Sequence, residues 1–415
     1  MAATMVERPL GKPRWKSRLL LLGPAFVAAI AYVDPGNVAA NLTAGANYGY
    51  LLVWVLVAAN IMAVLVQYQS AKLGLATGQT LPELLGKRLG THHRRLFWVQ
   101  AEVVAAATDV AEVIGGAVAL NLLFGLPLLM GGVIIGVASM LLLALQSSRG
   151  QKPFEYAIMM LLAVIAVGFV SGLFVNPPAT GGVLAGLVPR FEGTDTVLLA
   201  ASMLGATVMP HAIYLHSALA RDRHGVSRDG LRTRTLLRAT RLDVVLALVL
   251  AGAVNVAMLL LAASALPGVA GTDTIEGAHA AISAALGPAI GVIFAVGLLA
   301  SGLASTSVGS YAGAAIMSGL LRVRVPLLAR RIVTLIPAVA ILALGADPTW
   351  ALVMSQVFLS LGIPFAMIPL LRLTGSRAVM GARADAAWVR VVGWGVAALV
   401  VALNLALVAF TVLPQ

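Results

Sequence analysis

The chain alternates between long apolar stretches and short polar segments along almost its whole length. Apolar runs of about 20 residues are long enough to cross the hydrocarbon core of a bilayer as helices, so the pattern predicts an all-α membrane protein. Eleven transmembrane helices are expected, at residues 19–44, 50–71, 97–121, 126–146, 155–175, 197–219, 243–265, 279–302 with a polar extension, 331–346, 350–371 and 388–412.

The composition agrees with this pattern. Hydrophobic residues make up 60% of the 415 residues and charged residues only 11%, whereas charged residues are near a quarter of a soluble protein. The absence of cysteine excludes disulfides and thiolate metal sites. The first apolar run continues without a small-residue cleavage site, so no signal peptide is expected. We expect a basic tail at 1–18 and a single transmembrane domain at 19–412.

The basic residues define an orientation. The formal net charge is +12, and all of the 28 Lys and Arg except Arg190 fall in segments on one side of the eleven spans. Lys and Arg retained in the cytoplasm set topology, which predicts a cytoplasmic N-terminus and an extracytoplasmic C-terminus. The basic surplus therefore indicates topology and contact with anionic lipids, not nucleic-acid binding. A bacterial inner membrane is the expected location.

Two of the predicted spans contain helix-breaking residues in their middle. The first includes 31–37 (Ala-Tyr-Val-Asp-Pro-Gly-Asn) and the sixth includes 205–211 (Gly-Ala-Thr-Val-Met-Pro-His). Proline lacks an amide hydrogen and glycine adds backbone freedom, so both helices should break. Breaks at matching positions predict inverted five-helix halves, at about 19–175 and 197–371, with 388–412 as an extra helix. A tolerated proline kink is the alternative for each break taken alone.

Residues suited to binding metal lie beside both breaks. Asp34 places a carboxylate in mid-span, which costs roughly 3 kcal/mol unless it is paired or functional. Asn37 offers an amide oxygen, Met209 a thioether, and unwinding frees backbone carbonyls such as those of Ala31 and Ala206. A mixed oxygen and sulfur shell favours manganese, iron, cobalt or cadmium over magnesium and calcium. Core packing is the alternative for Met209.

The motifs Asp34-Pro35-Gly36-Asn37 and Met209-Pro210-His211 resemble the paired signatures of the Nramp family of proton-coupled manganese and iron transporters. The resemblance extends from about Leu20 to the last span and implies a LeuT-type 5+5 inverted repeat with helices 1 and 6 broken at mid-membrane. It implies Mn²⁺ as cargo, with Fe²⁺, Cd²⁺ and Co²⁺ also carried, and no prosthetic group. The implied metal ligands are Asp34, Asn37, Met209, the carbonyls of Ala31 and Ala206, and, in closed states, Gln356.

Three acids follow one face of the third span. Glu102, Asp109 and Glu112 are spaced by seven and three residues, so they lie near one helical face and must face the protein interior or water. The segment 108–112 also resembles the family's proton route, which starts at Asp34. By that resemblance Arg330 and Arg331 are the route's basic partners. Interhelical ion pairs without a transport role remain the alternative.

The histidines divide into two groups. His211 could relay protons, because its pKa lies near physiological pH, or could form a hydrogen bond within the broken helix. His216 lies on another face of the same helix and is the weaker candidate. His92 and His93 fall in a predicted cytoplasmic loop beside arginines, where a solvated role is expected.

Other functional classes are alternatives to a metal transporter. The chain has neither a His-Glu-x-x-His motif nor a Walker-type glycine loop, so it is not expected to be an enzyme. A channel would place its polar residues along a continuous pore, and an amino-acid transporter of the same fold would bind the substrate's carboxylate and amine at the breaks. The expected function is secondary active import of divalent metal ions with protons, by alternating access. The expected partners are these ions and membrane lipids, without an obligate protein partner.

Overall fold

The computed structural model describes residues 22–225 and 230–412, apart from 270, 273 and 324, so the tail at 1–18 and residues 19–21 lie outside it. All regular elements within the described ranges are helical. They are α2 (Pro24–Ala29), the 3-10 turn η1 (Ile30–Val33), α3 (Pro35–Tyr48), α4 (Val53–Thr77), α5 (Leu81–Arg88), α6 (Thr91–Phe124), α7 (Leu128–Arg149), α8 (Gln151–Val175), α9 (Thr180–Ala185), α10 (Thr194–Thr207), α11 (Pro210–His224), α12 (Gly230–Ala265), α13 (Ile275–Leu286), α14 (Pro288–Leu321), α15 (Leu327–Ala343), α16 (Pro348–Thr374), α17 (Arg377–Met380), η2 (Gly381–Arg383) and α18 (Ala387–Val412).

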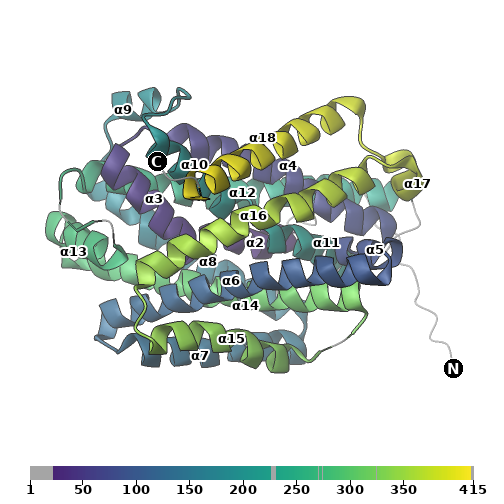
Figure 1. Ribbon diagram of the computed structural model, residues 1–415, viewed down its shortest axis with the longest axis horizontal. Coiled ribbons are helices and arrows are strands. Elements are labelled where there is room, and N and C mark those ends of the chain that lie inside the picture. Colours follow the sequence, from purple (N-terminus) through teal and green to yellow (C-terminus); the bar gives the residue numbers. More distant parts are fainter. Residues whose placement is uncertain (1–21, 226–229, 270, 273, 324, 413–415) are drawn as a thin grey trace.

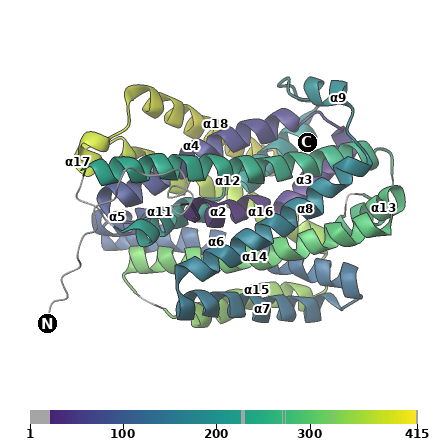
Figure 2. The same ribbon diagram turned by 180° about the vertical axis from the view of Figure 1, so that it is seen from behind.

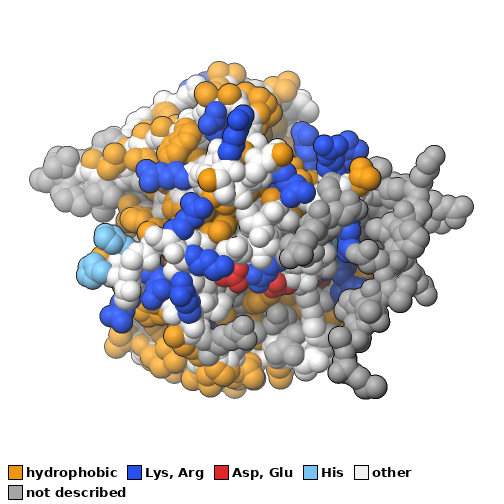
Figure 3. Space-filling model, turned by 90° about the vertical axis from the view of Figure 1, so that its right-hand side faces the viewer, with side chains coloured by type: hydrophobic (Ala, Val, Ile, Leu, Met, Phe, Trp, Pro, Cys, Tyr) orange, Lys and Arg blue, Asp and Glu red, His pale blue; other side chains and the backbone are white. Residues whose placement is uncertain are grey.

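The long helices run roughly along the long axis of the molecule, with the short connecting helices at its two ends. Helices α9 and α13 lie at one end, and α5 and α17 at the other (Figures 1 and 2). Lys and Arg side chains gather over the end that carries α5 and α17, with few acids among them (Figure 3). The folded chain therefore gathers basic side chains at this end of the molecule.

The described part of the chain contains nine helices that are long and apolar enough to cross a membrane. Large apolar side chains are exposed on the outer helices, for example Leu141 on α7, Met160 on α8 and Val391 on α18. Extensive exposed apolar surface of this kind marks a surface that contacts lipid or another apolar partner. The chain is an integral membrane protein.

The predicted eighth span, 279–302, is wrong in its boundaries. Helix α13 ends at Leu286, and Gly287, with a φ of +96°, turns the chain into α14 at Pro288. Proline is suited to the first turn of a helix because no partner is needed for an amide hydrogen there. Helix α14 continues to Leu321, so its polar middle belongs to the buried helix. His92 and His93 are exposed, as expected, but lie in the first turn of α6 and not in a loop.

Helices α6 and α14 pack closely in the centre of the molecule. A Cβ atom placed on Gly302 of α14 would lie 2.9 Å from the carbonyl oxygen of Glu112 and from the Cα of Gly116 on α6. Such close approach is possible only with small residues at the crossing. It holds the acid-bearing face of α6 against α14, beside the two interrupted helices.

Candidate functional site

The first break separates α2 from α3. Helix α2 gives way to η1, and Asp34 has extended backbone, with ψ of 167°, before α3 begins at Pro35. The Asp34 Oδ1 atom accepts the backbone N–H of Asn37 at 2.8 Å and its side-chain Nδ2 at 2.6 Å. Pro35 has no N–H for the carbonyl of Ala31, four residues earlier, so a continuous helix could not satisfy that oxygen.

The second break has the same construction. Helix α10 ends at Thr207, Met209 is extended, and α11 begins at Pro210. Pro210 again has no N–H for the residue four positions earlier, here Ala206. The Asn37 side chain donates to the Ala206 carbonyl at 2.9 Å. The two breaks, 169 residues apart, therefore lie in direct contact through a side chain at the first of them.

Several oxygen atoms at the breaks are buried without a hydrogen-bond partner among the described residues. They are Oδ2 of Asp34, Oδ1 of Asn37 and Oε1 of Gln356. The Gln356 amide lies against Gly36, so closely that no Cβ would fit there. Asp34, Asn37 and Met209 are completely buried. Unpaired buried oxygens cost free energy unless a ligand or ion meets them, and this donor set with the Met209 thioether suits a divalent transition-metal ion.

The site does not use a cluster of acids and histidines. Within the described ranges, no three His, Asp or Glu side chains are grouped closely enough to hold a metal ion. The breaks offer one carboxylate, two amides and a thioether, together with the carbonyls of Ala31 and Ala206. The structure thus brings Asp34, Asn37, Ala206 and Gln356 together.

Neighbouring helices satisfy the other carbonyls that unwinding exposes, and sequence reasoning missed these residues. Ser301 donates to the Val33 carbonyl at 2.5 Å, and Ser305 donates to that of Ile30 at 3.2 Å. Asn255 of α12 donates to the Tyr32 carbonyl at 2.6 Å. The available signal is the run of serines and threonine in α14, which is interpreted from the sequence only as a polar extension of the predicted span 279–302 and not as a set of hydrogen-bond donors.

The acids of α6 face arginines at the start of α15. Asp109 Oδ1 pairs with Nη1 of Arg331 at 2.7 Å, and Arg331, which is completely buried, also donates to Ser139 at 2.9 Å. Glu102 pairs with Arg330 at 2.6 Å. Glu112 is completely buried, and neither of its carboxylate oxygens has a hydrogen-bond partner within the described chain. The arrangement forms a continuous row of charged groups beside the breaks.

The two buried histidines of α11 differ in their surroundings. His211 follows Pro210 at the break, and neither ring nitrogen has a partner among the residues described. His216 Nδ1 lies 2.8 Å from Gln67 Oε1, and Gln67 donates to the hydroxyl of Tyr32 at 2.5 Å. No local sequence signal singles out Gln67, which joins α4 and α11 to the first break.

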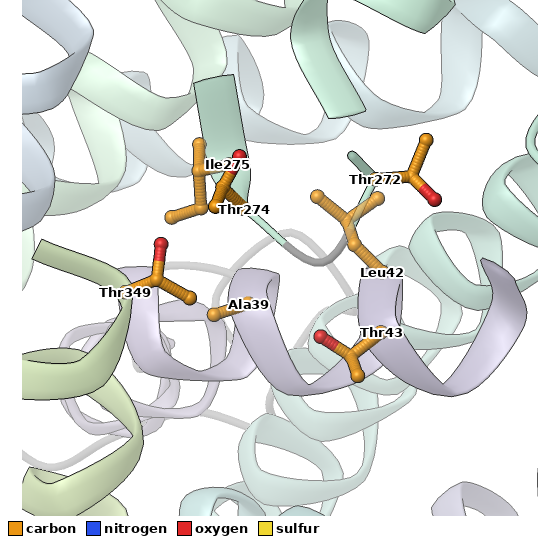
Figure 4. A pocket seen from close by; sticks show the side chains of 7 residues that line it. All are labelled: Ala39, Leu42, Thr43, Thr272, Thr274, Ile275 and Thr349. Atoms are coloured by element: carbon orange, nitrogen blue, oxygen red, sulfur yellow. The ribbon is translucent and has the colours of Figure 1, made fainter. Parts of the chain in front are cut away.

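Two small pockets, each of about 170 Å³, lie near the breaks. One lies along α3 and is lined by Ala39, Leu42, Thr43, Thr272, Thr274, Ile275 and Thr349 (Figure 4). The other lies between α6, α11 and α14 and includes Gln100 and His211. Neither pocket is lined by Asp34 or Met209, and both of these side chains are completely buried.

Comparisons of sequence agree over almost the whole chain. The family profile described as natural resistance-associated macrophage protein-like, or Nramp, matches residues 25–410. A Mycobacterium tuberculosis protein named divalent metal cation transporter MntH is 62% identical over 397 residues, which are 96% of this chain and 93% of that protein. The Bacillus subtilis protein of the same name is 45% identical over 404 residues, 97% of this chain and 95% of its own length.

Solved structures give the same result. A mutant of the Eremococcus coleocola manganese transporter matches with a TM-score of 0.89 and 33% identity, covering 99% of this chain and 91% of that one. Mhp1, a nucleobase-cation-symport-1 family transporter in a closed conformation, matches at 0.61 with 16% identity, covering 93% and 91%, and shows the fold alone. The chain belongs to the Nramp family, whose members are metal-ion transporters and not enzymes.

Proposed function

We propose that this protein is a secondary active transporter that imports divalent transition-metal ions with protons, by alternating access. The proposal depends mainly on three buried oxygens, of Asp34, Asn37 and Gln356, that have no hydrogen-bond partner among the described residues. They lie where two proline breaks meet each other. Mn²⁺ is the proposed cargo. The ligand preferences of Fe²⁺, Cd²⁺ and Co²⁺ are similar enough to those of Mn²⁺ for these ions to be carried as well. The names of the curated relatives, divalent metal cation transporter, and of the Eremococcus coleocola manganese transporter support this cargo class.

In this proposal, each donor has a separate task. Asp34 supplies the charge, and Asn37 and Gln356 supply amide oxygens that have no hydrogen-bond partner among the described residues. The carbonyls of Ala31 and Ala206 complete the oxygen shell. Met209 supplies the single soft ligand, which favours transition metals over magnesium and calcium. Ion binding would draw Asn37 Oδ1 and Asp34 Oδ2 towards one centre, at a place where the backbone is already non-helical.

The architecture that we propose has eleven spans. The nine candidate spans include α10 and α11 as one. The interrupted segment α2–η1–α3 and the helix α15, of 17 residues, bring the number to eleven. Two inverted halves with the breaks at mid-membrane follow from this order.

The likeness to Mhp1 and to MhsT in complex with L-phenylalanine, the latter at a TM-score of 0.58 and 16% identity, supports the fold. The basic end (Figure 3) supports a cytoplasmic N-terminus at an inner membrane.

Proton coupling would use the charged row on α6. Two positive charges at Asp34 require it to be ionised, so a proton held there would leave as the metal arrives. Asp109, Glu112 and Glu102 would pass the proton on, with Arg330 and Arg331 as their basic partners. His211 would be an additional carrier, because both of its nitrogens lack partners within the described chain.

Uptake by purified protein in proteoliposomes tests the proposal. Mn²⁺, Cd²⁺, Mg²⁺, Ca²⁺ and phenylalanine are offered with and without an external acid gradient. Manganese and cadmium should accumulate, faster with the gradient, while magnesium, calcium and phenylalanine should not. Asp34→Ala should stop uptake, and Asp195→Ala, which removes an exposed acid in the first turn of α10, should not. Phenylalanine uptake without metal uptake would overturn the assignment.

A further inference from the structure

Helix α12 is longer than a membrane crossing needs. It contains 36 residues, about 54 Å of helix. The part from Leu242 to Ala265 alone measures about 35 Å, which already covers a hydrocarbon core of about 30 Å. The first three turns of α12 therefore extend beyond the core, at the end of the molecule that carries the basic side chains (Figures 2 and 3).

This extension is held rigidly on one face. Thr233, Leu236 and Ala239 are buried, and Leu236 packs against Ala71 of α4 and Ala220 of α11. The buried positions repeat every three residues, so the opposite face of the same turns is left uncovered. The extension is thus fixed to the helix bundle and presents a defined surface.

The uncovered face carries arginines in line with exposed apolar residues. Leu242, Leu246 and Val249 are 41%, 42% and 56% exposed, which marks the lipid-facing stripe of α12. Arg238 and Arg234 precede Leu242 by four and eight residues, so they continue that stripe about 6 and 12 Å beyond it. Both are exposed, and the side chain of neither forms an ion pair or hydrogen bond with another residue in the described part of the chain.

We propose that Arg234 and Arg238 form a binding surface for the headgroups of anionic phospholipids in the cytoplasmic leaflet. A topology signal requires only that basic residues lie on the cytoplasmic side. Here the arginines continue the exposed apolar stripe itself, which in a bilayer would place their guanidinium groups among the lipid headgroups, next to phosphates. Guanidinium groups bind phosphates in a two-pronged geometry. The inference rests on the proposed orientation, but not on metal transport.

The surface is directly connected to the first broken helix. Asp243, next to Leu242 but on the buried side, accepts the backbone N–H groups of Gly23 at 3.0 Å and Ala25 at 2.9 Å. These are the residues at which α2 begins. Arg238 precedes Asp243 by five residues on the same helix, and Asp243 holds the start of α2. A lipid bound at Arg238 would therefore steady the part of α12 that anchors α2, so lipid composition should also affect the stability of this end of the molecule.

The test compares two double variants with equal charge changes. Arg234→Gln/Arg238→Gln removes the proposed surface, and Arg88→Gln/Arg377→Gln removes two exposed arginines from the short helices α5 and α17. Purified proteins in detergent are titrated with short-chain phosphatidylglycerol or phosphatidylcholine, and binding is followed by native mass spectrometry and by the rise in Tm. Inorganic phosphate serves as a competitor, to separate lipid from a free anion.

The expected result is a loss of phosphatidylglycerol affinity of roughly 25-fold in Arg234→Gln/Arg238→Gln, since each basic residue near an anionic surface contributes about fivefold. Phosphatidylcholine binding should not change, and the control should match the wild type. Equal losses in both double variants would mean that only net charge matters and would overturn the proposal. So would wild-type binding by Arg234→Gln/Arg238→Gln, or full competition by inorganic phosphate. Manganese uptake is not part of the readout, so failure here leaves the transport proposal intact.

Discussion

The buried pair of Asp109 and Arg331 allows a quantitative prediction. Arg331 is completely buried, and Asp109 is the only carboxylate that forms an ion pair with it in the described chain, at 2.7 Å. The change Asp109→Asn keeps the size and one acceptor oxygen but removes the counter-charge. Removing one partner of a buried ion pair costs about 3–5 kcal/mol, because the remaining charge is left uncompensated in a low dielectric. We expect Asp109→Asn to lower the free energy of unfolding by this amount.

The matched control is the same chemical change in an exposed pair. Arg190 and Glu192 are 3.9 Å apart and their side chains are 55% and 64% exposed, so Glu192→Gln should cost less than about 1 kcal/mol. The measurement is chemical unfolding of the purified proteins in detergent, followed by intrinsic tryptophan fluorescence.

A double variant identifies the cause of the loss. Asp109→Asn/Arg331→Gln leaves no unpaired charge, so it should be more stable than Asp109→Asn alone. The reasoning is refuted if Asp109→Asn costs no more than Glu192→Gln. It is equally refuted if the double variant costs the sum of its two single variants, since the charges would then act independently.

Three further predictions concern the breaks. Asp34→Ala should abolish manganese uptake in proteoliposomes while expression is retained, and near wild-type uptake would contradict its role as a ligand. Met209→Ala should keep part of the manganese transport, lose more cadmium transport and let calcium or magnesium compete; unchanged rejection of calcium and magnesium would show that the thioether is not the filter. Gly115→Ala places a Cβ against the ring of Pro35 at the first break and should lower both Tm and uptake, whereas Gly395→Ala, at an exposed position inside α18 with open space around it, should do neither.

The helix breaks could be predicted because their cause is local. A proline four residues after a carbonyl removes that carbonyl's partner wherever the helix lies, and this holds for Pro35 and Pro210 alike. The contact between the two breaks is a tertiary contact, which local sequence rules cannot predict, because Asn37 and Ala206 are 169 residues apart. In the sequence, the predicted inverted-repeat arrangement and the resemblance of the two motifs to the paired Nramp signatures indicated it.

The neighbours of the site were missed for a different reason. Ser301 and Ser305 are placed by the packing of α14 against the first break, and in the sequence they are small polar residues in an apolar helix. The boundary between α13 and α14 at Gly287-Pro288, in contrast, is predictable from the sequence. Glycine is typical of the residue after a helix, where φ is often positive, and proline is typical of the first helical position. The error there was to follow hydropathy across a turn that is itself apolar.

The same ion pair constrains how protons could be coupled to metal in the proposed cycle. A proton on Asp109 removes the counter-charge of Arg331, as the change to Asn does, but a proton handed over by a second carboxyl leaves that second group ionised. Proton acceptance would therefore cost several kcal/mol unless another carboxylate took over the pairing. Glu112 is the candidate, because it is buried one turn further along α6 and both of its oxygens lack partners among the described residues. One negative charge shared between Asp109 and Glu112 would let a proton move along α6 while Arg331 stays compensated throughout.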